Sequence, residues 1–176
     1  MLQLKAFTET NFTKLFNFEA QVYVTAPDEV IVEYSLKGPS NHLHFPPSHE
    51  DGMARRDELW KTTCFEAFFS ANQNTESPYL EINCSPAGDW NAYSFSSYRQ
   101  GMTPHPKAEV KLIQVEPEPE AVLFRVRIQC PDLVKFRQMG ITSVVEFSDG
   151  SKSYWSLSHP GPQADFHNKS GFTHPL

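Results

Sequence analysis

The sequence has 176 residues with 21 acidic and 15 basic side chains, a net charge of −6 at pH 7, and 14 residues each of Phe and Pro. A chain of this length can bury about 70% of the surface of its unfolded form, so we expect a single domain over residues 1–176 with its own core. The acidic balance, without a cluster of Lys or Arg, excludes a phosphate-binding surface and hence nucleic acid as a partner.

The first third of the chain predicts three short strands. Apolar and polar residues alternate, as they do along a strand with one buried face, over residues 2–7, 18–25 and 29–37. The segment 38–58 that follows is a long loop with three prolines and an HxH pair, His42 and His44. We interpret these histidines as solvated, because no Cys or acidic partner stands at the spacing of a metal ligand.

Two strand-like runs near the middle of the chain each divide into an apolar face and a second face. The core faces are predicted to carry Thr63, Phe65, Ala67 and Phe69 from the first run, and Leu80, Ile82 and Cys84 from the second. A hairpin through residues 72–77 would join the two remaining faces. That joint surface would carry Glu66, Glu81 and Asn83 beside Trp60.

The last third predicts two hairpins and one helix. Residues 108–115 and 122–130 pair across the acidic segment 116–120, and residues 142–148 and 153–159 pair through an Asp-Gly turn. Pro131 at a first-turn position and Gly140 as a stop predict a short helix over residues 131–139. About ten strands and one short helix indicate an all-β fold, an antiparallel β-sandwich of jelly-roll or immunoglobulin-like type.

The three cysteines, Cys64, Cys84 and Cys130, stand singly in or beside strand-like runs. We expect buried, reduced thiols rather than a zinc site, and no bound metal. No apolar run is long enough to cross a bilayer, and the N-terminal segment lacks the apolar region of a signal peptide. We therefore expect a cytoplasmic protein without a membrane partner.

The surface beside Trp60 has the residue types of a sugar site. An indole offers a flat apolar face to a pyranose ring, and carboxylate and amide groups bind its hydroxyls. Arg99, Arg125 or Arg127 could neutralise the carboxylates. Two other interpretations stay open: rim packing with a solvated sheet face, and a glycosidase pair of carboxylates. We favour a binding site over an enzyme.

Four segments of the sequence resemble a known family. The runs LWKTTCFEAFF, YLEINCSPAGDWNAYSF, YRQGM and SYWSLSHPGPQADFHNKSGF are similar to bacterial DOMON-like domains related to family 9 carbohydrate-binding modules. The resemblance covers about two-thirds of the chain, residues 59–172. It implies a jelly-roll sandwich that binds a saccharide or sugar derivative without catalysis. The acidic, metal-binding loops of some relatives are not recognisable in this chain, so we expect no structural calcium.

The resemblance also implies which residues bind the ligand. In sugar-binding relatives a tryptophan precedes a strand glutamate by six positions, as Trp60 precedes Glu66, and the next strand supplies polar contacts, as Glu81 and Asn83 could. A second aromatic platform lies in the C-terminal loop of those relatives, where this chain has Phe166. The predicted ligand-binding residues are Trp60, Glu66, Glu81, Asn83, Arg99, Phe166 and His167.

Two alternative functions belong to other classes. Some DOMON relatives hold haem between a methionine and a histidine, and Met102 or Met53 with His105 could supply such a pair. The chain could also be a protein-interaction module that displays its polar sheet face. We expect no cofactor, and the sequence leaves the oligomeric state open.

Overall fold

The computed structural model describes all 176 residues, which form thirteen β-strands and five short 3-10 helices. The strands are β1 (Leu2–Ala6), β2 (Asn17–Ala26), β3 (Glu29–Lys37), β4 (Leu43–His44), β5 (Cys64–Ser70), β6 (Tyr79–Cys84), β7 (Trp90–Phe95), β8 (Thr103–Pro104), β9 (Glu109–Glu118), β10 (Ala121–Gln129), β11 (Gln138–Phe147), β12 (Lys152–Ser156) and β13 (His174–Pro175). The 3-10 helices are η1 (Thr13–Leu15), η2 (Ser40–His42), η3 (Leu59–Lys61), η4 (Pro131–Lys135) and η5 (Lys169–Gly171).

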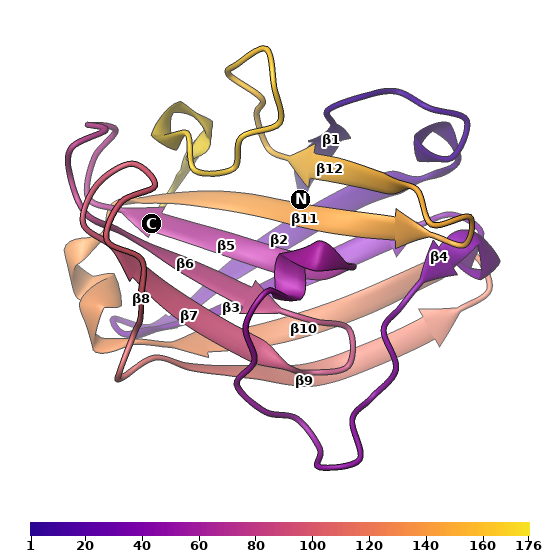
Figure 1. Cartoon of the computed structure of the whole chain (residues 1–176), viewed down its shortest axis with the longest axis horizontal. Coiled ribbons are helices and arrows are strands. Elements are labelled where there is room, and N and C mark those ends of the chain that lie inside the picture. Colours follow the sequence, from indigo (N-terminus) through magenta and orange to yellow (C-terminus); the bar gives the residue numbers. More distant parts are fainter.

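The strands form one antiparallel sheet that curls into two facing layers (Figure 1). One layer has the order β8-β7-β6-β5-β11-β12, and the other has the order β2-β3-β10-β9. Strand β1 joins them, because it pairs with β12 on one side and with β2 on the other. The predicted all-β antiparallel sandwich is confirmed. No helix is long and apolar enough to span a membrane.

The main core lies between the two layers and contains 28 buried hydrophobic residues. Phe65 of β5 shows how it is built, because its ring lies 4.8 Å from the ring of Tyr34 and 4.4 Å from that of Phe124, both in the opposite layer. Phe65 also lies opposite Cys84 of β6, another core residue. The apolar inner faces that the alternation predicts for β5 and β6 are confirmed.

The outer face of β5, β6 and β7 carries a second apolar cluster under the C-terminal segment of the chain. Its buried members are Phe68, Tyr79, Tyr93, Phe95 and Phe172. Gly140 of β11 makes room for this segment, because a Cβ atom there would lie 2.7 Å from the Phe172 ring. Both faces of β5 and β6 are therefore covered, which explains why every residue of these strands is buried.

The predicted helix over residues 131–139 is wrong. The chain makes only the 3-10 helix η4 and then enters β11 at Gln138. The Arg137 N–H donates to the Ser70 carbonyl at 2.9 Å, and Gln138 lies opposite Ser70 in the sheet. Pairing with β5 thus replaces the hydrogen bonds that a helix would have used. As a result β11 begins four residues before the predicted strand at 142.

The remaining strand predictions differ from the structure mainly at their ends. The two-residue strands β4, β8 and β13 had no recognisable pattern, and β7 was not predicted as a strand; the other nine strands correspond to the predicted runs. The strand predicted over residues 153–159 ends at Ser156, where the chain turns away to cover the outer face. All three cysteines are buried and free, as predicted.

Candidate functional site

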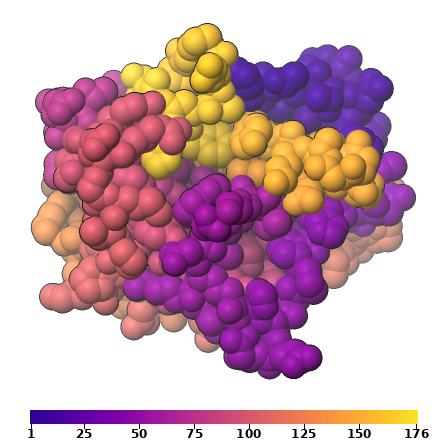
Figure 2. Space-filling model, viewed as in Figure 1, coloured from indigo at the N-terminus to yellow at the C-terminus, as the bar shows by residue number.

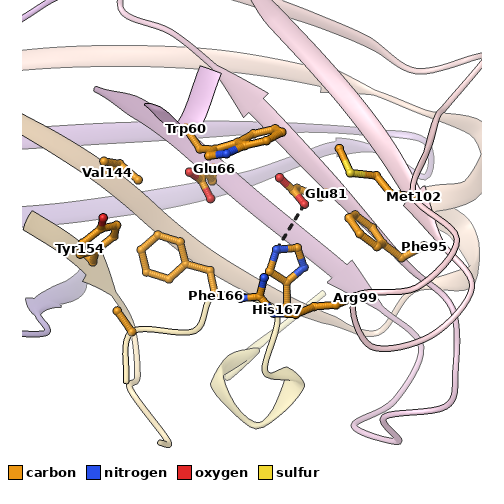
Figure 3. Close-up of a pocket in the computed structure, with 11 residues that line it drawn as sticks. Trp60, Glu66, Glu81, Phe95, Arg99, Met102, Val144, Tyr154, Phe166 and His167 are labelled. Carbon is orange, nitrogen blue, oxygen red and sulfur yellow. Dashed lines mark ion pairs between the residues drawn. The ribbon is translucent and has the colours of Figure 1, made fainter. Parts of the chain in front are cut away.

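A pocket of about 380 Å³ lies on the outer face of β5, β6 and β11 (Figure 3). Four segments meet around it on one face of the molecule: η3, the loop after β7, β12 and the C-terminal loop (Figure 2). Eleven residues line it: Trp60, Glu66, Glu81, Phe95, Arg99, Met102, Val144, Tyr154, Ala164, Phe166 and His167.

Trp60 is held in place by a short 3-10 helix. Glu58 just before η3 has a left-handed backbone with φ of 61°, which turns the chain so that the indole lies over the sheet. The indole packs edge-on against Tyr93 with ring centroids 6.0 Å apart. The ammonium group of Lys152 on β12 donates to the Lys61 carbonyl and ties η3 to the sheet. Trp60 is half-buried and borders the pocket.

Glu66 and Glu81 lie on neighbouring strands and point to the same side of the sheet (Figure 3). In the β5–β6 pair Glu66 lies opposite Asn83, and Phe68 lies opposite Glu81, so the two glutamates are diagonal neighbours. Glu66 is 3% exposed and Glu81 is 4% exposed. Two acidic groups are thus brought together at the base of the pocket.

Glu81 has two polar neighbours. Its Oε1 accepts a hydrogen bond from Asn83 Nδ2 at 2.7 Å, and its Oε2 lies 3.8 Å from His167 Nε2. Burial raises the pKa of Glu81 to about 7, although the Asn83 hydrogen bond and the charge of Arg99 oppose the shift. Glu81 therefore exchanges its proton near neutral pH.

The Glu66 carboxyl group has no comparable hydrogen bond. Its Oε1 is buried without a hydrogen-bond partner, and so is Oγ1 of Thr142, the residue opposite it on β11. Burial raises the pKa of Glu66 well above its usual range, and the neighbouring Glu81 raises it further, while the nearby Thr142 hydroxyl opposes the shift without a bond of good geometry. Unpaired buried oxygens are uncommon in folded proteins, and this one is sealed from solvent, so the pocket is lined by the other atoms of Glu66.

His167 is a neutral side chain with a defined tautomer. Burial and the charge of Arg99 lower its pKa to about 4. The Tyr79 hydroxyl accepts from the Arg99 N–H at 3.2 Å and lies 2.7 Å from His167 Nδ1, where we assign it as the donor because the ring N–H is then directed at the Glu81 carboxyl group. This assigns the ring proton to Nε2, which faces Glu81.

Arg99 lies at the rim of the pocket and is already paired. Its backbone is left-handed with φ of 55°, and its guanidinium donates to Asp165 Oδ1 at 2.7 Å. Tyr98 donates to Asp165 Oδ2 at 2.6 Å. Burial opposes ionisation of Asp165, but the hydrogen bonds from Tyr98 and Arg99 outweigh it and lower the pKa of this carboxyl. This ion pair joins the loop after β7 to the C-terminal loop.

Six of the seven residues predicted to bind a ligand line this pocket; Asn83 does not. Asn83 is fully buried, where its amide donates to Glu81 and its Oδ1 accepts from the Cys64 thiol at 3.8 Å. It therefore positions Glu81 and does not face the pocket. Arg125 and Arg127 lie on β10 in the opposite layer, so Arg99 is the one of the three candidate arginines near the carboxyl groups.

Five lining residues were not found from the sequence: Phe95, Met102, Val144, Tyr154 and Ala164. Two of them could have been found from the hairpin predicted over residues 142–148 and 153–159. Val144 lies opposite Tyr154 in the β11–β12 pair, and both side chains point away from the core. Met102 and Ala164 come from irregular loops, where alternation gives no information about direction.

The candidate haem ligands do not meet in one cavity. Met102 borders the pocket, but His105 is buried elsewhere, with its Nε2 3.1 Å from Asp132 Oδ2. Met53 packs toward Gly88 in the loop between β6 and β7. Neither proposed methionine and histidine pair could bind opposite sides of one haem iron. The histidines of the HxH pair are also separate, since His42 packs on Phe12 and His44 is exposed on β4.

Comparison with known proteins gives a likeness in fold. No protein-family model matches the sequence, and no curated protein matches it significantly. Among solved structures, the chain is similar to a "putative carbohydrate-binding protein" from Bacteroides uniformis. The TM-score is 0.60 with 11% sequence identity, over 97% of this chain and 84% of that chain. At this identity the similarity shows that the two chains share a fold.

Proposed function

We propose that this chain binds a saccharide or sugar derivative, without catalysis, in the pocket between Trp60 and Phe166. The observation that carries this proposal is the position of the two buried carboxyl groups between aromatic walls, with one carboxyl oxygen lacking a partner. Sugars present apolar C–H faces and several hydroxyl groups at once, so a site for them needs both kinds of surface.

The aromatic walls suit a pyranose ring. Trp60 borders one side of the pocket and Phe166 the other, with the carboxyl groups between them in Figure 3. Each ring is braced by a neighbour, Trp60 by Tyr93 and Phe166 by Tyr154 at 6.1 Å. Because these rings are already ordered, little conformational entropy is lost when a sugar packs between them. The pocket volume of about 380 Å³ lies within the usual range for small-molecule sites.

The polar base of the pocket suits hydroxyl groups. A ligand hydroxyl could donate to the carboxyl group of Glu66, which lines the pocket. A second hydroxyl could bind Glu81 Oε2, which has only His167 Nε2 at 3.8 Å beside it. The fixed orientation of the neutral His167 ring adds specificity at the same point.

The fold likeness supports the same class of ligand. The Bacteroides uniformis protein of the same fold is a "putative carbohydrate-binding protein", and the sequence resembles family 9 carbohydrate-binding modules. A binding role predicts that a sugar leaves the site chemically unchanged.

Calorimetric titration against a panel of monosaccharides and disaccharides tests this proposal. We expect at least one sugar to bind and the variant Trp60→Ala to lose about tenfold or more in affinity, because the wall of the pocket is removed. Tyr23→Ala is the control, because it removes an exposed aromatic ring from the opposite layer. Unchanged affinity in Trp60→Ala would reject this site, and NMR detection of a converted sugar would reject a purely binding role.

A further inference from the structure

The pocket holds more acidic groups than basic ones. Glu66, Glu81 and Asp165 supply three carboxyl groups at or beside it, whereas Arg99 supplies one guanidinium that donates to Asp165. His167 is neutral at physiological pH, because burial and Arg99 lower its pKa to about 4. No Lys or Arg side chain forms an ion pair with Glu66 or Glu81. The two buried glutamates therefore lack a cation from the chain itself.

The walls around these glutamates also suit a positive charge. Four aromatic residues line the same pocket: Trp60, Phe95, Tyr154 and Phe166. The face of an aromatic ring attracts a cation through its quadrupole, and the attraction grows when the cation is removed from water. Aromatic rings alone would accept a neutral sugar equally well. The combination of aromatic rings with unpaired buried carboxyl groups favours a ligand that carries a cation.

Building on the proposed function, we infer that the saccharide is an amino sugar whose ammonium group binds between Glu66 and Glu81. An ammonium group has three donors and no acceptor, so it can donate to the carboxyl groups of Glu66 and Glu81 together, both of which line the pocket. A hydroxyl has a single hydrogen to donate and brings no charge. It would leave the two acidic neighbours without electrostatic compensation.

This inference links binding to the release of protons. In the free protein burial disfavours the ionised form of both glutamates, and a bound ammonium group favours it. The groups that face the pair are those of its own strands, the neighbouring strands and the covering loops: Cys64, Thr142, Tyr79, Asn83, Tyr93, Arg99, Asp165 and His167. Glu81 has a pKa of about 7, so a bound ammonium group would draw off its proton near neutral pH.

The test is calorimetric titration with matched sets of sugars. Each set contains an amino sugar, its N-acetyl form and the parent sugar, for example D-glucosamine, N-acetyl-D-glucosamine and D-glucose, with galactose and mannose sets beside it. We expect the amino member of one set to bind about tenfold or more tightly than its two neutral relatives. The titrations run near pH 6.5, where the amine is largely charged, in two buffers of different protonation enthalpy to count released protons.

The outcomes separate the two proposals. Tighter binding of a neutral or N-acetylated member, or binding of the amino sugar without proton release, would overturn the inference and leave sugar binding intact. If no member of any set binds at millimolar concentration, the proposed function and the inference both fail.

Two variants locate the ammonium site. Glu81→Gln and Glu66→Gln keep the shape of the side chain and remove its charge, and we expect each to lower amino-sugar affinity about tenfold or more with a smaller effect on a neutral sugar. Glu76→Gln is the control, because Glu76 is exposed in the loop between β5 and β6. Thermal unfolding of each variant verifies its fold. Unchanged preference for the amino sugar in both pocket variants would contradict the inference.

Discussion

Acidic residues on the outer faces of the two layers differ in solvent exposure and in ion pairing. On the β3–β10 pair, Glu33 accepts from Arg125, and Glu29 lies 4.0 Å from Arg127, at a surface open to solvent. On the β5–β6 pair, Glu66 and Glu81 are covered and form no ion pair with Lys or Arg, since the nearby Arg99 is paired with Asp165. Strand alternation places acids on both outer faces, but only the covered pair needs a proton or a ligand to balance its charge.

Among these predictions, the largest change in stability should come from the C-terminal segment, which covers the outer face of β5, β6 and β7 with Phe172. Phe172→Ala removes a 1% exposed ring of the second apolar cluster, and Gly140 beneath it leaves no side chain to fill the space. We expect a loss of about 3 to 5 kcal/mol in the free energy of unfolding, measured by denaturant titration. Val134→Ala, at a residue 48% exposed, should change it by less than about 0.5 kcal/mol. Equal effects would show that the C-terminal segment does not pack as described.

The covered acids should also make stability depend on pH. The pKa of Glu81 is raised by burial from 4.5 to about 7, so the folded state binds the proton more tightly than the unfolded state. The free energy of unfolding should therefore fall as pH rises from about 4.5 to 7, by about 3 kcal/mol for this group. Denaturant titrations at several pH values measure the slope.

Glu81→Gln should reduce this pH dependence, because the amide does not titrate and only the contribution of Glu66 remains. Glu33→Gln, which removes a carboxyl group from the opposite layer, is the matched control. Suppose that the pH dependence of the free energy of unfolding is unchanged in Glu81→Gln and lost in Glu33→Gln. The carboxyl group responsible would then lie in the opposite layer, which would contradict our assignment.

The hydrogen bonds behind the pocket should have a smaller effect. Tyr79→Phe removes the hydroxyl that donates to His167 Nδ1 and accepts from the Arg99 N–H. We expect a loss of about 1 to 2 kcal/mol in stability, because two polar groups lose a partner. NMR of the His167 ring nitrogens should show the tautomer with the proton on Nε2 in the wild type and a mixture in the variant. An unchanged ring spectrum would contradict the proposed hydrogen-bond chain.

The exposed ion pair of the opposite layer should have the smallest effect. Arg125→Gln breaks the contact with Glu33, but Arg125 is about a third exposed and water replaces the lost interaction. We expect a change of about 0.5 kcal/mol or less, and a further decrease of the effect at high salt. A loss comparable to that of Phe172→Ala would mean that this surface is not solvated.

Part of the site follows from the sequence by geometry. Alternation along β5 and β6, with a hairpin between them, is enough to place Glu66 and Glu81 on one face beside Trp60. The same reasoning placed Asn83 on that face but could not show that its amide would be used by Glu81. Which polar group reaches a ligand depends on side-chain hydrogen bonds, and a periodic pattern does not contain them.

The covering of that face could not be read from alternation. Phe166 and His167 were found through the family resemblance, and Met102 was considered only as a haem ligand, because loops lack a period that fixes their direction. The wrong helix over residues 131–139 has a related cause. Its turn signals are real and form η4, but long-range pairing of Gln138 with Ser70 decides where β11 begins.

A crystal structure of the protein with its tightest-binding sugar tests the central claim most directly. We predict a sugar ring between the side chains of Trp60 and Phe166, with a donor group of the ligand within hydrogen-bond distance of the Glu66 carboxyl group, which lines the pocket. A sugar bound at any other surface, without a contact to Glu66, would contradict it.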